Sequence, residues 1–194
     1  MEAFLRELLP CILPVDRSFE IHTFQGKRDL LGKLENRLRG YARWLPADWR
    51  IVVVVDRDDD DCLRLKQQLE DAASGANLRT RSRVDDRSWQ LVNRIAVEEL
   101  EAWYFGDWEA VRNAYPKISP TVPNQSRYRN PDSVQGGTWE AFERILKERG
   151  YFKTGLRKVE TARAVAAYIN PARNRSVGFT KFHDALAEAT SCQQ

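Results

Sequence analysis

The hydrophobic and polar positions change their spacing several times along the chain, and these changes predict strands that alternate with helices. Residues 51–55 form a continuous apolar, mostly β-branched run bounded by charged residues, which is typical of a parallel strand buried on both faces. Helical spacing of apolar residues predicts a helix over 29–44 before this strand and another over 62–73 after it. The expected fold is therefore α/β, with a mostly parallel sheet flanked by helices.

Weaker patterns predict the remaining elements. Alternating apolar and polar residues predict strands over 18–24 and 77–84. Helical spacing predicts helices over 2–9, 138–149, 156–168 and 180–189, and a segment rich in Pro, Asn and Ser predicts a loop over 116–131. We expect two parts: an α/β core over 1–115, and a mainly helical C-terminal extension over 116–194 that packs on the core.

A cluster of carboxylates directly follows the buried apolar run. Extended geometry would place Asp56 and Asp58 on one side of the chain and Arg57 on the other. Ligands of open α/β sheets bind at the carboxyl ends of the strands, and two oxygen ligands there suit Mg²⁺ or Mn²⁺ better than a soft metal. Aspartates also begin helices, as N-caps or in the first turn. We assign that simpler role to Asp59, Asp60 and Asp61.

A second acidic group lies in residues 93–105. If this segment is helical, Glu98 and Glu101 share one face while Leu100 and Trp103 pack inward. Amphipathic helices commonly carry such acids on their solvent face, so the pattern alone favours a structural role.

The charges are segregated along the chain, although the net charge is only +3. Residues 51–110 contain 8 basic and 14 acidic residues, whereas residues 117–183 contain 13 basic and 5 acidic ones. An acidic centre beside a basic half suits an enzyme that acts on a polyanion. An ordinary solvated basic helical face explains the counts equally well.

Other features argue against several classes of protein. The 42% hydrophobic content is that of a globular protein, and three scattered cysteines with two distant histidines give no zinc or disulfide pattern. Without a signal peptide or membrane span, we expect a cytoplasmic protein that does not bind membranes. Lys27 follows Gly26 but lacks the rest of a P-loop, and no Thr follows Asp58 as in haloacid-dehalogenase-like phosphatases.

Four stretches resemble a prokaryotic family, domain of unknown function 4276, that is related to the Toprim (topoisomerase–primase) nucleases. The stretches are Phe19–Leu31, Val52–Cys62, Arg94–Trp103, and Arg173–Ser176 followed by Phe179. Toprim domains are small parallel α/β folds that bind a divalent metal through an Asp-x-Asp pair plus a glutamate. They usually open with a strand that carries this glutamate. Because Met1 stands where the next helix begins, we expect that first strand to be missing here.

The resemblance implies a Mg²⁺- or Mn²⁺-dependent nuclease that cleaves phosphodiesters, with DNA favoured over RNA as the substrate. It also implies a role in phage defence beside a companion ATPase. Asp56 and Asp58 would hold the metal, and the acid–base role would fall to Glu98, Glu99 or Glu101. The residues expected to bind nucleic acid are Lys27, Arg57, Arg173 and Arg175. A homo-oligomer is a further state that is compatible with this interpretation.

The alternative is a Toprim-like module that has lost catalysis and serves as a partner or sensor. It would bind nucleic acid or an ATPase, and the missing first strand favours it. The two hypotheses differ in whether a third carboxylate joins Asp56 and Asp58 around one ion.

Overall fold

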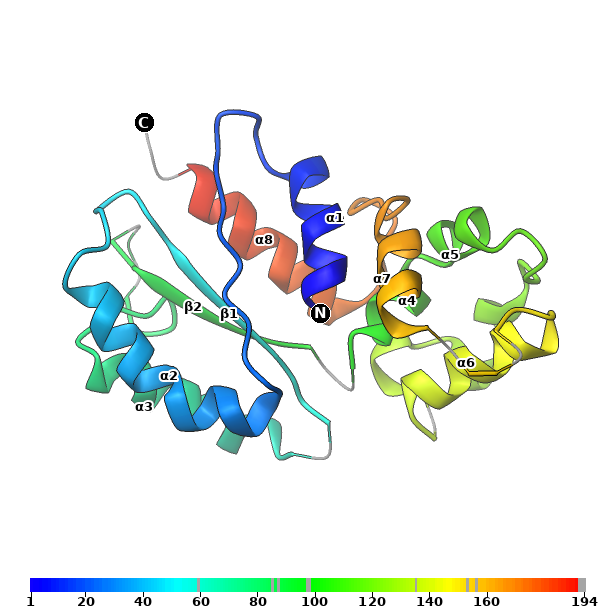
Figure 1. Ribbon diagram of the computed structural model, residues 1–194, viewed down its shortest axis with the longest axis horizontal. Coiled ribbons are helices and arrows are strands. Elements are labelled where there is room, and N and C mark those ends of the chain that lie inside the picture. The colour runs from blue at the N-terminus through cyan, green and yellow to red at the C-terminus, as the bar shows by residue number, and fades with distance from the viewer. Residues whose placement is uncertain are drawn as a thin grey trace. The chain divides into compact units, whose positions relative to one another are not determined.

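The computed structural model describes residues 1–58, 60–84, 86, 88–96, 99–134, 136–152, 154–155 and 157–191. Within these residues the chain is mixed α/β, with eight α-helices, three short 3₁₀ helices and one sheet of two parallel strands (Figure 1). The elements in chain order are α1 (Glu2–Ile12), α2 (Lys27–Ala42), β1 (Ile51–Asp56), α3 (Cys62–Gly75), β2 (Leu91–Ala96), α4 (Glu101–Gly106), α5 (Trp108–Ala114), η1 (Val122–Asn124), η2 (Ser126–Tyr128), η3 (Pro131–Ser133), α6 (Thr138–Glu148), α7 (Lys158–Ala166) and α8 (Val177–Ser191).

Contacts within the chain group it into two units. The helical unit comprises Met1–Ile21 and Ala96–His183, and the sheet unit comprises His22–Ile95 and Asp184–Gln194. Each unit is therefore assembled from two separate stretches of sequence. This grouping follows contacts, not independent folding, so the predicted division between residues 115 and 116 stays a prediction.

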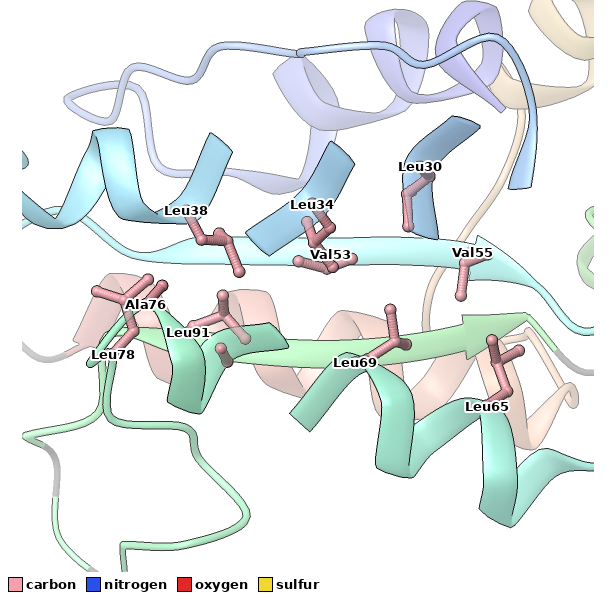
Figure 2. Packing of buried hydrophobic residues seen from close by; sticks show 11 residues of the cluster. Leu30, Leu34, Leu38, Val53, Val55, Leu65, Leu69, Ala76, Leu78 and Leu91 are labelled. Carbon is pink, nitrogen blue, oxygen red and sulfur yellow. The ribbon is translucent and has the colours of Figure 1, made fainter. Parts of the chain in front are cut away.

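In the sheet unit, β1 and β2 lie side by side, and α2 and α3 cover the same face of the sheet (Figure 1). Alternation along β1 points Val53 and Val55 to this face. Figure 2 shows their side chains among the leucines of the two helices. The leucines that face the sheet are Leu30, Leu34 and Leu38 of α2 and Leu65 and Leu69 of α3.

The opposite face of the sheet packs on the last part of α8. Trp89, Val92 and Ala185 form a buried cluster there, and the side chain of Val52 packs against it. Successive valines of β1 thus contact different layers, with Val53 and Val55 buried on one face and Val52 half-buried on the other.

The helical unit has an aromatic core. The indole of Trp103 in α4 stacks on Phe182 with ring centroids 5.0 Å apart and meets Phe179 edge-on at 5.4 Å. Phe4 of α1 contacts the same indole at 5.8 Å. Aromatic pairs at such distances stabilise beyond their buried area, and they explain why a helix as short as α4 has every residue buried.

Several predicted helices are confirmed, with ends that shift by a few residues. The segments predicted over 29–44, 62–73, 138–149, 156–168 and 180–189 correspond to α2, α3, α6, α7 and α8. The helix predicted over 2–9 continues to Ile12 and contains Pro10. We expected the helix to end at Pro10, which lacks a backbone N–H, but the helix continues two residues beyond it.

Two strand predictions are wrong, and the helix considered for residues 93–105 forms only from Glu101 onward. Residues 18–24 form no strand, and Phe24 packs against the core from an irregular segment. Residues 77–84 contribute one bridge, between Thr80 and Leu91, and not a full strand. Residues 93–96 belong to β2 and not to a helix, because pairing with β1 outweighs their helical spacing.

The fold class is thus confirmed as mixed α/β with a helical C-terminal part. A two-stranded sheet is compatible with many α/β families, so the Toprim-like arrangement stays a prediction. None of the described helices is long and apolar enough to cross a membrane.

Candidate functional site

The candidate site lies in the sheet unit, where β1 ends and the chain turns toward α3. Asp56 is the last residue of β1 and is half-buried. Asp58 then adopts a left-handed backbone with φ of 48°, which Asp tolerates better than most residues. The N–H of Asp60 donates to the carbonyl of Arg57 at 3.2 Å and closes a turn. Strand geometry therefore ends at Asp56, and alternation no longer determines the direction of Asp58.

Lys27, the first residue of α2, contributes its ammonium group to this turn. The Nζ atom lies 2.7 Å from Oδ2 of Asp58 and 2.7 Å from Oδ2 of Asp60. It also donates to the carbonyl of Arg57 at 2.8 Å. An ammonium group has three donors, so these three oxygen atoms match its full capacity.

The surroundings of Lys27 favour its charged form. Desolvation, the largest single influence, lowers its pKa, but the hydrogen bonds and negative charges of Asp58 and Asp60 together outweigh it. The pKa of Lys27 is consequently raised above its ordinary value. The ammonium group is a permanent cation at neutral pH and offsets part of the carboxylate charge.

The other aspartates of the cluster have different roles. Asp61 caps α3, since its side chain accepts from the N–H of Arg64 at 2.8 Å, as predicted. Asp60 does not act as a helix cap, because its carboxylate pairs with Lys27. Asp59 lies outside the described residues.

The oxygen atoms around Lys27 are of the type that Mg²⁺ binds. Mg²⁺ commonly binds through one or two carboxylates and keeps several waters for its remaining positions. Asp58 and Asp60 already direct one oxygen each to a common cation, and their side chains are about half exposed, at 49% and 51%. Among the described residues no group of three or more His, Cys, Asp or Glu side chains is arranged to hold a metal. Any metal here would thus depend on water or substrate oxygens.

Comparison with known proteins identifies a family. A family model described as a domain of unknown function (DUF4276) matches residues 1–187. The chain belongs to this family. No curated protein and no solved structure matches the chain. The predicted family is confirmed. The description of the family names no fold, so the Toprim-like nuclease fold stays a prediction.

Of the predicted site residues, Glu99 and Glu101 belong to the helical unit, whereas Asp56 and Asp58 belong to the sheet unit. The Oε2 atom of Glu99 accepts from Thr138 Oγ1 and from the N–H of Trp139, both at 2.9 Å. Glu99 thus caps the N-terminus of α6, where a negative charge also meets the helix dipole favourably. Glu101 is 9% exposed in the first turn of α4, and Glu98 lies outside the described residues.

Two further basic residues predicted to bind nucleic acid, Arg57 and Arg173, make side-chain contacts within the protein. Arg173 donates to both carboxylate oxygens of Asp107, from Nε and Nη2 at 3.2 Å. The hydrogen bonds to Asp107 raise the pKa of the Arg173 guanidinium. The side chain of Arg175 is exposed, and the Nε atom of Arg57 donates to the carbonyl of Asp58 at 3.3 Å.

Two buried carboxylates were not singled out from the sequence. Asp107 is 2% exposed and accepts from the N–H of Asn170 at 2.7 Å in addition to its pair with Arg173. Its position directly before α5 is an N-cap signal that sequence reasoning could have used. Glu70 is 7% exposed and accepts from Thr80, and no sequence pattern distinguishes it from a surface glutamate of α3.

Proposed function

We propose that this member of the DUF4276 family is a Mg²⁺-dependent nuclease that cleaves nucleic-acid phosphodiesters, in phage defence beside a companion ATPase. The observation that carries the proposal is that Asp58 and Asp60 both pair with the ammonium group of Lys27 at the carboxyl end of a parallel strand. Ligand sites of parallel α/β sheets lie at this end of the strands. Asp56 stands at the same strand end, although among the described residues no three acidic side chains are arranged around one ion.

The residues around the turn have complementary roles in this proposal. Bound Mg²⁺ would polarise the phosphodiester and lower the pKa of the attacking water. Asp56 and Asp58 would hold the cation, and Lys27 and Arg57 would bind the phosphate backbone. Glu99 caps a helix and Glu101 is buried, so we assign neither of them the role of accepting the proton of the water.

The test is cleavage of supercoiled plasmid and of single-stranded DNA with Mg²⁺ or Mn²⁺. The double variant Asp56→Ala/Asp58→Ala should lose at least about 100-fold in nicking rate, since even groups that only orient metal ligands contribute about 10–100-fold. Asp71→Asn is the matched control, because Asp71 is an exposed carboxylate of the same unit with its nearest cation 3.8 Å away. Nicking that survives in the double variant, or that persists in EDTA, would contradict the proposal.

A second candidate function is supported by Lys27. Its ammonium already pairs with both Asp58 and Asp60, so the cluster can exist without a metal. A module with these contacts and no catalysis would bind nucleic acid or an ATPase. Absence of cleavage by the wild-type protein, together with retained binding of single-stranded DNA, would favour this candidate.

A further inference from the structure

Helix α7 of the helical unit has one packed face and one open face. Thr161, Ala162, Val165 and Ala166 are buried, and the helix packs against α1 and α5. A hollow of about 740 Å³ opens beside its first two turns, a volume in the usual range of ligand sites. The residues that line this α7 hollow are Arg157, Lys158, Val159, Glu160, Arg163 and Ala164.

The α7 hollow carries an excess of positive charge. Its lining contributes three basic side chains and one acidic side chain, all of them exposed. Glu160 pairs with Arg157, whose Nη1 atom lies 3.1 Å from Oε2. Within the part of the chain that the structure describes, no ion pair involves Lys158 or Arg163. Two cations beside the hollow are thus left to attract an anion from solution.

Apolar and aromatic groups accompany these cations. The Nζ atom of Lys158 lies 3.7 Å from the ring centroid of Trp139 in α6, within the range of a cation–π contact. Trp139 is half-buried, and its backbone N–H donates to Glu99, which holds this end of α6 in place. Val159 is exposed and adds apolar surface to the lining.

This combination suits single-stranded nucleic acid better than other polyanions. Proteins that bind single strands combine a basic surface, which follows the phosphates, with apolar and aromatic side chains that contact the bases. A duplex keeps its bases paired inside, and an acidic peptide has no bases, so each would use the cations alone. The hollow also lies in the basic stretch 117–183, with its 13 basic and 5 acidic residues.

We infer that the α7 hollow binds single-stranded nucleic acid, with Lys158 and Arg163 at phosphates and a base against the apolar lining. The inference goes beyond the proposed function, because this surface belongs to the helical unit and not to the turn after β1. It needs no metal, so it applies equally to a nuclease and to a module without catalysis.

The test is fluorescence anisotropy of a labelled single strand of thymidines, titrated with the full chain in EDTA over a series of salt concentrations. Each phosphate contact on a single strand contributes about 0.7 to the slope of log K against log salt. Lys158→Gln/Arg163→Gln should therefore reduce the slope by about 1.4. The same two contacts correspond to a loss of roughly 50-fold in affinity at about 50 mM salt.

Two further variants make the result specific. Lys147→Gln is the matched control, because Lys147 lies in the same basic stretch but on α6, where it pairs with Glu143 at 3.0 Å. It should keep the wild-type slope. Glu160→Gln removes the acidic residue of the lining and should tighten binding severalfold, a gain that misfolding cannot produce. Circular dichroism establishes that each variant folds.

Several outcomes would overturn the inference. One is a wild-type slope in Lys158→Gln/Arg163→Gln, and another is an equal reduction in Lys147→Gln. Equally tight binding of a duplex of the same length, or equal competition by polyglutamate, would show that the apolar lining has no part. Absence of binding by the wild type in EDTA would also overturn it. Loss of Mg²⁺-dependent cleavage alone would count against the proposed nuclease and not against the α7 hollow.

Discussion

At the scale of single residues, the carboxylates of this chain are distinguished by their partners and not by their type. Asp58 pairs with an ammonium, Asp61 caps a helix, and Asp107 holds a guanidinium. Glu70 is a fourth case, a buried carboxylate that accepts from neutral donors and has Arg83 Nε 4.0 Å from its Oε2 atom. Its oxygens accept from Thr80 Oγ1 at 2.6 Å and Asn93 Nδ2 at 2.9 Å.

Glu70 should make stability depend on pH. Desolvation raises its pKa, but the hydrogen bonds from Ser82, Thr80 and Asn93 together lower it below the ordinary 4.5. The folded-state pKa is then below the unfolded-state value, so the stabilisation is present above about pH 4.5 and is lost as pH falls through the folded-state pKa.

The measurement is urea unfolding of wild type and Glu70→Gln at pH 7 and at about pH 3. The wild type should be more stable at pH 7 by about 1.5–3 kcal/mol, the range for hydrogen bonds to charged groups, and the difference should shrink at low pH. Asp71→Asn, at an exposed neighbour, should change little at either pH. A difference that does not vary with pH would contradict this role of Glu70.

The residue scale also shows where sequence reasoning stops. The strand and the aspartates after it could be predicted, since a β-branched run followed by charge has few other interpretations. The pairing of Lys27 with Asp60 could not, because it joins residues 33 positions apart through a turn whose left-handed residue, Asp58, has no distinctive pattern.

At the scale of elements, helices were predicted better than strands. The apolar stripe of α2 has helical period and a single partner layer, so Leu30, Leu34 and Leu38 identify it directly. The six residues of β2 also carry apolar side chains at helical spacing, and only their pairing with β1 decides the outcome. Tertiary pairing of this kind is not encoded in local spacing.

Two glycines in helices should respond in opposite ways to alanine. Gly32, inside α2, is exposed, and a Cβ there would meet nothing within 4 Å, so Gly32→Ala should stabilise the protein by about 0.5–1 kcal/mol. A Cβ on Gly106, at the end of α4, would lie 2.0 Å from Asn174 Oδ1 and 2.9 Å from the N atom of Ser176.

Gly106→Ala should consequently destabilise by about 1–3 kcal/mol, the usual cost of overpacking. Thermal and urea unfolding of the two variants beside the wild type provide the check. Equal effects at both positions would show that helix propensity, and not the close approach of Asn174, determines the result.

At the scale of the whole molecule, the charge segregation bears on nucleic-acid binding. The exposed Arg175 lies in the basic stretch 117–183, which carries 13 basic and 5 acidic residues. If it contacts phosphate, Arg175→Ala should weaken binding to all single-stranded sequences similarly and reduce the slope of log K against log salt by about 1.

Anisotropy titrations of a labelled oligonucleotide over a series of salt concentrations measure this slope. Arg6→Ala is the control, because Arg6 pairs with Glu2 at 2.8 Å on α1, outside the basic stretch. An unchanged slope in Arg175→Ala would exclude Arg175 from the phosphate contacts.

The interleaving of the two units has a consequence for synthesis. Helix α8 begins in the helical unit and ends in the sheet unit, where Ala185 covers Trp89 and Val92. While the ribosome is still translating residues 96–183, the sheet has one bare apolar face. At about 5–20 residues per second, this exposed state lasts several seconds. Nascent chains of this protein should therefore need chaperone protection until α8 has emerged.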